Sequence, residues 1–269
     1  MADEEPARRS RGTTSFDERA QRARSFGQVA ELYDRSRPGY PDALYADVLR
    51  LGPGGRVIEA GAGTGRATLA LARRGASVVA VEPDPAMAAV ARLRVQGMEV
   101  AVMESTFEDC TPPAGTFDLV VAAQAWHWVD PERGAAAAAR ALRPEGALCV
   151  WWNRPGERAG PVWDVIDAAY AEHAPALDRR AALRRQPAIE AQAKPAPGFA
   201  AWTARTYDWS AIYDAVSYGD LVQTHSDHLQ LAAPRRERLV DAIRAAITDA
   251  GGGRLEYRYR TLLLTAQVQ

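Results

Sequence analysis

The feature that most constrains the fold is a glycine-rich turn between a short apolar run and an alanine-rich helix pattern. Residues 56–66 read Arg-Val-Ile-Glu-Ala-Gly-Ala-Gly-Thr-Gly-Arg, so every second residue of the turn is a glycine. Glycine lets the backbone bend tightly and lie close to a ligand, where a side chain would collide. A second apolar run, residues 78–81, ends at Glu82, whose carboxylate can accept hydrogen bonds from both hydroxyls of a ribose. The two runs predict a nucleotide-binding turn at the carboxyl ends of neighbouring strands.

Two residues indicate which nucleotide suits this turn. A dinucleotide fingerprint has a further glycine at its sixth position, where this chain has Arg66. Glu59 precedes the first glycine, where its negative charge would oppose a pyrophosphate. S-adenosylmethionine carries a sulfonium and an ammonium but no phosphate, so the acidic pair Glu59 and Glu82 favours it over NAD. An NAD-dependent oxidoreductase and a non-catalytic S-adenosylmethionine-binding protein remain the alternatives.

Several segments resemble the class I S-adenosylmethionine-dependent methyltransferases. They are the run from Phe26 to Tyr40, the glycine segment, and residues 82–87, 117–121, 124–128 and 141–146. Residues 124–128 are most similar to the group that includes trans-aconitate methyltransferase and small-molecule methyltransferases of bacterial secondary metabolism. The resemblance implies an enzyme that uses S-adenosylmethionine as donor, releases S-adenosylhomocysteine, and methylates a small aromatic or apolar metabolite.

Apolar runs alternate with helix patterns, which predicts an α/β protein with a doubly wound, mostly parallel sheet. We expect strands at residues 56–60, 77–82, 98–103, 117–123, 147–152 and 255–264, and helices at 16–34, 41–50, 64–74, 84–94, 131–142, 161–173, 213–222 and 234–250. The resemblance implies a Rossmann-like sheet of seven strands with a helical cap inserted after the fifth. The expected segments are a disordered tail (1–15), a donor-binding core with N-terminal lid helices (16–154), a substrate cap (155–250) containing a loop at 186–198, and a C-terminal strand completing the sheet (251–269).

Ligands of open α/β sheets bind at the carboxyl ends of the strands, which places the expected donor site. The expected donor-binding residues are Tyr33, Arg37, Glu59, Gly61, Gly63, Glu82, Pro83, Met87, Thr106, Phe107 and Gln124. The resemblance implies that Tyr33 and Arg37 reach the methionine carboxylate, to which an arginine fork is well suited, and that Met87 packs on the adenine. Alternatively, Tyr33 and Arg37 belong to an ordinary helix end with surface charges and bind no ligand. Met87 could likewise be a core residue that only fills space.

His127 follows the fourth predicted strand and is the candidate catalytic base. Alternatively, His127 only packs against the following helix, or the acceptor needs no base. We expect Trp128, Trp152 and His225 to contact the acceptor, because tryptophans near the strand ends predict an aromatic-lined pocket.

Composition excludes several classes of partner. A net charge of −1 offers no broad positive field for nucleic acid, and no apolar run is long enough to span a bilayer. Cys110 and Cys149 form no CxxC or Cys/His cluster, and the spacing of His225 and His228 resembles a metal pair only weakly, so we expect no metal. The N-terminus has no apolar core typical of a secretory signal. These features favour a cytoplasmic enzyme acting on a small molecule and leave a homodimer open.

Overall fold

The computed structural model describes residues 30–177 and 198–269. The expected tail at 1–15, most of the expected helix at 16–34 and nearly all of the expected loop at 186–198 lie outside these ranges.

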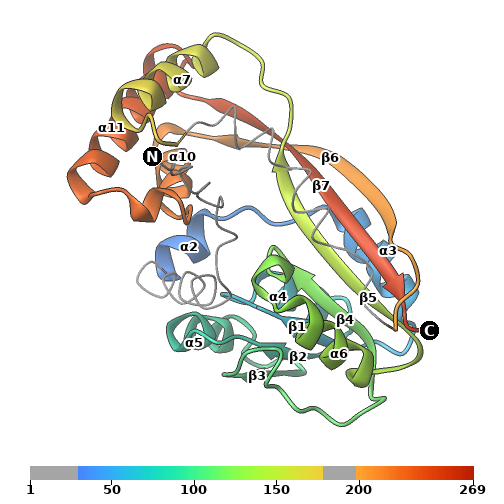
Figure 1. The fold of residues 1–269 in the computed structure, drawn as a ribbon. Coiled ribbons are helices and arrows are strands. Elements are labelled where there is room, and N and C mark those ends of the chain that lie inside the picture. The colour runs from blue at the N-terminus through green and yellow to red at the C-terminus, as the bar shows by residue number, and fades with distance from the viewer. Residues whose placement is uncertain (1–29, 178–197) are drawn as a thin grey trace, which may run out of the picture.

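Seven strands form one sheet in the order β3-β2-β1-β4-β5-β7-β6 (Figure 1). Their bounds are β1 Arg56–Ala60, β2 Ser77–Val81, β3 Val100–Met103, β4 Phe117–Ala123, β5 Leu142–Pro155, β6 Thr203–Tyr213 and β7 Leu255–Gln267. The first five strands run parallel, and β7 is antiparallel to both of its neighbours. The chain order reverses between β1 and β4, so the prediction of a doubly wound, mostly parallel sheet is confirmed.

Helices cover both faces of this sheet. Their bounds are α2 Ala30–Ser36, α3 Asp42–Leu51, α4 Arg66–Ala72, α5 Pro85–Arg94, α6 Pro131–Ala141, α7 Val162–His173, α10 Ala215–Gln223 and α11 Ala233–Asp249, with 3-10 turns η2 Trp126–Trp128 and η3 His228–Gln230. Apolar residues of α3 and α4 pack on one face of β1, β4 and β5, and those of α6 pack on the other. Within the described ranges no helix is both long and apolar enough to cross a bilayer.

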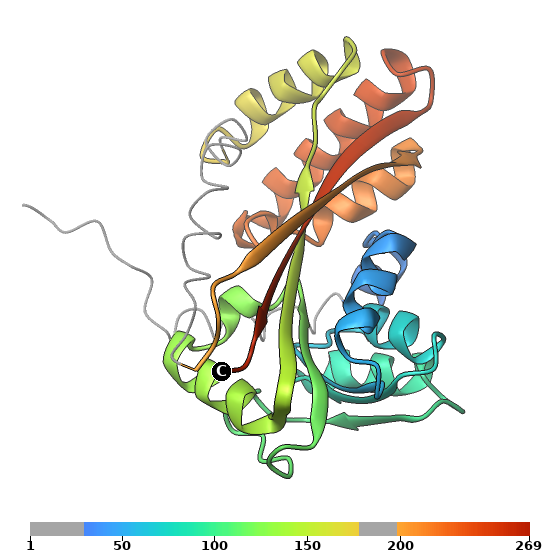
Figure 2. The ribbon, with the colours of Figure 1, turned by 90° about the vertical axis from the view of Figure 1, so that its right-hand side faces the viewer.

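Strands β5, β7 and β6 extend beyond the others and carry α7, α10 and α11 at their far end (Figure 2). These three helices share a hydrophobic cluster of their own with the adjoining ends of β6 and β7, which we call the cap cluster. Ile166, Tyr218 and Ile243 are fully buried in it. Apolar burial on this scale stabilises the cap as a second core built on the same sheet.

The structure differs from the expected helical cap in one element. Strand β6 lies within residues 155–250 and forms the outer edge of the sheet beside β7. Most of its side chains are exposed, because an edge strand has only one neighbour and its faces here are only partly covered. The cap region therefore combines three helices with a strand of the main sheet.

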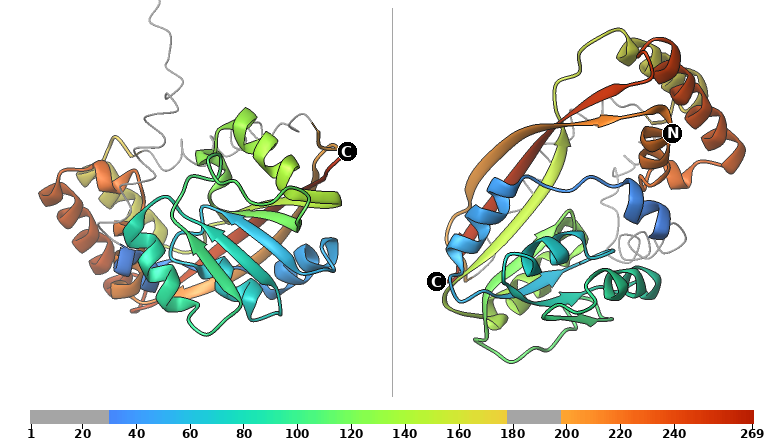
Figure 3. Two further views of the ribbon diagram at one scale, coloured as in Figure 1. Left: turned by 90° about the horizontal axis from the view of Figure 1, so that it is seen from below. Right: turned by 180° about the vertical axis from the view of Figure 1, so that it is seen from behind.

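Helix α2 contacts both α5, beside the parallel strands, and α10 of the cap. Asp34 forms an ion pair with Arg94 of α5, and Arg35 lies 3.5 Å from the Asp220 carboxylate of α10. Seen from behind, α2 lies between α5 and the helices of the cap (Figure 3). The position of α2 closes one side of the space above the glycine turn.

Candidate functional site

The turn between β1 and α4 has the geometry that its glycines predict. Gly61, Gly63 and Gly65 have φ angles of +67°, +58° and +78°, a region that residues with a Cβ rarely adopt. A Cβ added to Gly61 would lie 2.6 Å from the Cβ of Ala125, whereas one added to Gly63 would have no protein atom within 4 Å. The backbone at Gly61 is thus tightly packed, and the backbone at Gly63 faces open space.

Glu82 follows β2 and supports this turn from beneath. Its Oε2 accepts a hydrogen bond from the Gly63 N–H at 2.8 Å, and its Oε1 accepts one from the Asp84 N–H at 2.9 Å. Burial raises the pKa of Glu82 to about 7, although both backbone N–H groups act in the opposite direction. Each oxygen keeps a lone pair that can accept a further hydrogen bond.

Glu59, at the end of β1, is the most perturbed carboxyl at the turn. Its side chain is fully buried, and its Oε2 accepts a 2.5 Å hydrogen bond from the Thr68 hydroxyl. Burial is the main cause that raises the pKa of Glu59 to about 8, and the nearby charge of Glu82 adds to it. Its Oε1 has no hydrogen-bond partner. A cation entering here would meet a carboxyl that ionises at little cost once the cation is present.

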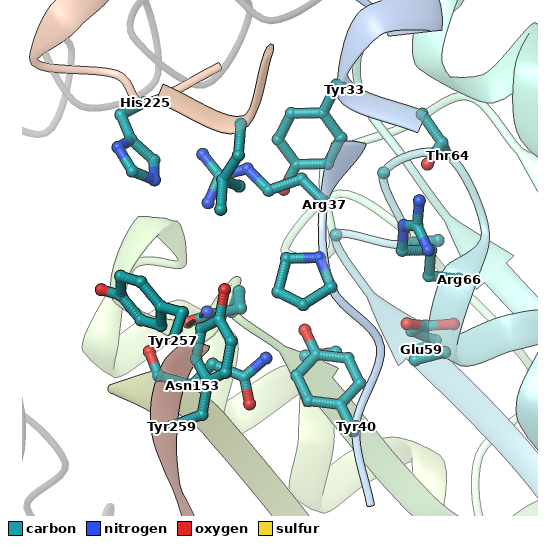
Figure 4. A pocket seen from close by; sticks show the side chains of 18 of the residues that line it. Tyr33, Arg37, Tyr40, Glu59, Thr64, Arg66, Asn153, His225, Tyr257 and Tyr259 are labelled. Atoms are coloured by element: carbon teal, nitrogen blue, oxygen red, sulfur yellow. Dashed lines mark hydrogen bonds between the residues drawn. The ribbon is translucent and has the colours of Figure 1, made fainter. Parts of the chain in front are cut away.

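A cleft opens above the glycine turn, between α2, the ends of β1, β4 and β5, and the cap (Figure 4). It encloses about 910 Å³, including its open mouth. Four buried polar atoms that lack a hydrogen-bond partner belong to residues lining it: Arg37 Nε, Glu59 Oε1, Thr64 Oγ1 and Arg66 Nε. Buried polar groups are nearly always paired, so this convergence of donors and acceptors points to a polar ligand.

The wall opposite the glycine turn is held by a hydrogen-bonded chain. Asn153 at the end of β5 donates from Nδ2 to the Gly39 carbonyl at 3.0 Å, and its Oδ1 accepts from the Thr261 hydroxyl at 2.6 Å. Trp209 of β6 in turn donates to the Thr261 hydroxyl at 2.8 Å and stacks on Tyr259, with the ring centroids 4.5 Å apart. These contacts fix the segment after α2 against the three long strands.

This chain is similar to known methyltransferases. Residues 58–150 match the profile of the methyltransferase domain family. An uncharacterized methyltransferase of Mycobacterium tuberculosis is 40% identical over 155 residues, which are 58% of this chain and 63% of that relative. Residues 58–150 are a class I S-adenosylmethionine-dependent methyltransferase domain. The chain thus covers less than two thirds of the length of this relative.

Solved structures share the fold of this chain. A candidate type II methyltransferase from Anaeromyxobacter dehalogenans superposes with a TM-score of 0.61 at 23% identity, over 87% of this chain and 97% of that one. Phosphoethanolamine N-methyltransferase 2 of Haemonchus contortus, bound to S-adenosylhomocysteine and phosphomonomethylethanolamine, has a TM-score of 0.55 at 16% identity, over 95% of this chain and 60% of that one. Both superpositions cover most of this chain, so the likeness is one of overall fold.

The cleft above the glycine turn is lined by part of the expected donor site. The expected donor residues that line it are Tyr33, Arg37, Glu59, Gly61, Gly63 and Gln124. The others, Glu82, Pro83, Met87, Thr106 and Phe107, lie outside its lining. Met87 and Phe107 are 3% and 4% exposed, and the Thr106 hydroxyl donates to Asp109 at 2.7 Å. These residues follow β2 and β3.

The expected acceptor residues separate in the same way. His225, which follows α10, lines the cleft, whereas His127, Trp128 and Trp152 do not. The Trp152 indole N–H donates to His127 Nδ1 at 3.2 Å, and the rings of His127 and Trp128 lie 4.5 Å apart. Trp152 itself is 2% exposed. These three side chains make an aromatic group beside the end of β4, adjacent to the cleft rather than within it.

His225, Asp227 and His228 form a group whose possible ligand atoms lie within 4.8 Å of one another. His228 already uses both ring nitrogens within the protein: Nδ1 lies 2.6 Å from Asp227 Oδ1, and Nε2 lies 2.7 Å from the Tyr170 hydroxyl. This pairing satisfies the buried imidazole without an ion and ties η3 to α7. The expectation that the protein needs no metal is therefore unchanged.

The sequence reasoning missed several residues of the cleft. They are Tyr40, Thr64, Arg66, Asn153, Leu221, Tyr257 and Tyr259. One signal was available for two of them: Tyr257 and Tyr259 are two residues apart on β7, so they share a face of that strand. Whether that face of β7 borders the cleft depends on the order of the strands in the sheet. Residue spacing does not determine that order.

Proposed function

We propose that this protein transfers a methyl group from S-adenosylmethionine to a small molecule bound between the glycine turn and the cap. The observation that carries the proposal is the set of unpaired buried polar atoms around the cleft. A carboxylate and an ammonium on one ligand would satisfy guanidinium donors and a carboxyl acceptor together, and the methionyl end of the donor has both.

The residues fit such a donor. Arg37 and Arg66 offer N–H groups for its carboxylate, and Glu59 offers an acceptor for its ammonium. Glu82 keeps lone pairs for the ribose hydroxyls, and the open space beside the Gly63 Cα leaves room for a ligand. We expect Met87, Thr106 and Phe107 to border the adenine. When bound, the donor supplies an electrophilic methyl group, and the protein orients the nucleophile toward it.

The acceptor is proposed to be a small aromatic or apolar metabolite, as in secondary metabolism. On the cap side the cleft is lined by Leu221, His225, Tyr257 and Tyr259, a mostly aromatic wall with polar atoms at its rim. His127 remains a candidate base only if the aromatic group around it opens to the acceptor. His225 already lies on the cleft and can exchange a proton with an acceptor there.

The first test is calorimetric titration of the purified protein with S-adenosylhomocysteine, with NAD as the control ligand. We expect micromolar binding of the first and none of the second. Binding of NAD alone would support the oxidoreductase alternative. Binding of S-adenosylhomocysteine without transfer to any acceptor in a metabolite extract would support a binding protein instead.

Replacing Glu82 should weaken donor binding strongly. Glu82→Ala removes the acceptor for the ribose and the partner of two backbone N–H groups, so we expect a loss of about 1–3 kcal/mol in the free energy of S-adenosylhomocysteine binding. Glu104→Ala is the matched control, because Glu104 follows β3, pairs with Arg92 at 2.5 Å and lies outside the cleft. Equal affinities of the two variants would remove Glu82 from the donor site.

A further inference from the structure

Tyr40 lines the cleft, and neighbouring aromatic rings hold its side chain in place. Its ring packs edge-on against Trp151 and Tyr45, with centroid distances of 5.9 Å and 6.3 Å. The preceding residue is anchored by the hydrogen bond from Asn153 to the Gly39 carbonyl. Ring packing of this kind on both sides leaves the tyrosine little rotational freedom.

The hydroxyl of Tyr40 points into the cleft. Figure 4 shows its oxygen between Glu59 on one side and Asn153 and Tyr259 on the other. Among the residues that the structure describes, none forms a hydrogen bond with this hydroxyl, and the residue lines the cleft. Burial, together with the neighbouring Tyr33, Tyr45 and Glu59, raises the pKa of Tyr40 well above its ordinary value, so the phenol stays neutral. A neutral phenol oxygen presents lone pairs to whatever lies opposite.

We propose that the Tyr40 hydroxyl oxygen contacts the sulfonium group of the methyl donor and so makes the site prefer S-adenosylmethionine to S-adenosylhomocysteine. This inference rests on the proposed function. The sulfur of the donor joins the methionyl part, expected at Glu59 and Arg37, to the ribose, expected at Glu82. Tyr40 lines the same cleft as Glu59 and Arg37, and we place the methyl group of the donor at the Tyr40 hydroxyl.

S-adenosylmethionine and S-adenosylhomocysteine differ in charge only at the sulfur atom. The sulfonium of the donor carries a positive charge that polarises its methyl C–H bonds, and the thioether of the product carries neither the charge nor the methyl group. A phenol oxygen accepts weak C–H hydrogen bonds, and an aromatic ring attracts a cation over its face. Removing the oxygen alone should therefore weaken donor binding and leave product binding unchanged.

The test is to measure the affinities of S-adenosylmethionine and S-adenosylhomocysteine for the unaltered protein and for Tyr40→Phe by calorimetry. We expect Tyr40→Phe to weaken binding of S-adenosylmethionine about fivefold and to change binding of S-adenosylhomocysteine less than twofold. Tyr45→Phe is the matched control, because Tyr45 packs on the same Trp151 but lies outside the cleft lining, and it should change neither affinity.

Each other outcome has a separate meaning. An equal loss for both ligands would assign the hydroxyl to the ribose or methionyl part and overturn the proposal, as would two unchanged affinities. If neither ligand binds the unaltered protein, the proposed function itself fails. Thermal unfolding of both variants shows whether the fold is retained, and Tyr40→Leu provides a second variant that removes ring and oxygen together and should weaken S-adenosylmethionine binding further.

Discussion

Lowering the pH from 8 to 5 is expected to stabilise the ligand-free protein, and Glu59→Gln should remove on the order of 3 kcal/mol of that gain. The folded protein keeps a proton on Glu59 up to a pH of about 8, whereas the unfolded chain loses it near its ordinary value of 4.5. Between these two pH values the folded state holds more protons than the unfolded chain, so the contribution of Glu59 to stability is fully present below pH 4.5 and is lost as the pH rises toward 8. Glutamine keeps the shape and cannot ionise.

Urea unfolding at pH 5, 6, 7 and 8 measures this dependence directly. In Glu59→Gln, the free energy of unfolding should still fall with pH, but less steeply, because Glu82 has a pKa of about 7. Adding Glu82→Gln should remove this remaining pH dependence. Glu104→Gln is the control on an exposed carboxylate and should keep the slope of the unaltered protein. If Glu59→Gln retains the full slope, then Glu59 is ionised in the folded protein and the burial argument fails.

The second large effect is expected at Gly61. Gly61→Ala combines a backbone with φ +67° and a Cβ placed 2.6 Å from that of Ala125, so one of the two segments must move. Strain and overpacking together should lower the free energy of unfolding by about 3 kcal/mol. Because the displaced segment is the floor of the cleft, binding of S-adenosylhomocysteine should also fall by more than tenfold.

Two matched variants separate the causes. Gly75→Ala has φ +89°, open space around the new Cβ and a position remote from the cleft, so it should cost only the backbone strain of about 1 kcal/mol and leave binding unchanged. Gly63→Ala, with φ +58° and equally open space, should cost the same stability but still lose ligand affinity, because its Cβ would occupy the ligand's place. Equal stability of all three variants would contradict the contact with Ala125.

Most of the donor half of the fold could be predicted because its signals are local. The apolar run, glycines and terminal carboxylate place β1, its turn and β2 within a residue or so of their observed positions. Strand β6 gave no such signal. Its residues Thr203–Tyr213 alternate weakly and are largely exposed, because an edge strand with partly solvated faces does not need an apolar run. The backbone hydrogen bonds to β7, which sequence does not reveal, determine its position.

The acceptor side was harder to predict for a related reason. Trp151 and Trp152 are adjacent at the end of β5, so their side chains point to opposite faces of the sheet, and both are buried there against helices. The sequence places both residues near the site but does not say that neither lines it. The tyrosines of the cleft come instead from β7, from α2 and from the segment after α2, which only the folded chain brings together.

Strand β7 belongs to each apolar cluster found in residues 30–177 and 198–269. Leu255 and Tyr257 lie in the cap cluster, Leu262 and Leu264 lie in the cluster on the α6 side of the sheet, and Leu263 lies in the cluster on the α3 side. A strand shared in this way couples the cores, so that opening any one of them exposes surface in the others. The cap should therefore not melt as a separate unit. The part of the cleft wall that β7 forms should therefore be as stable as the whole molecule.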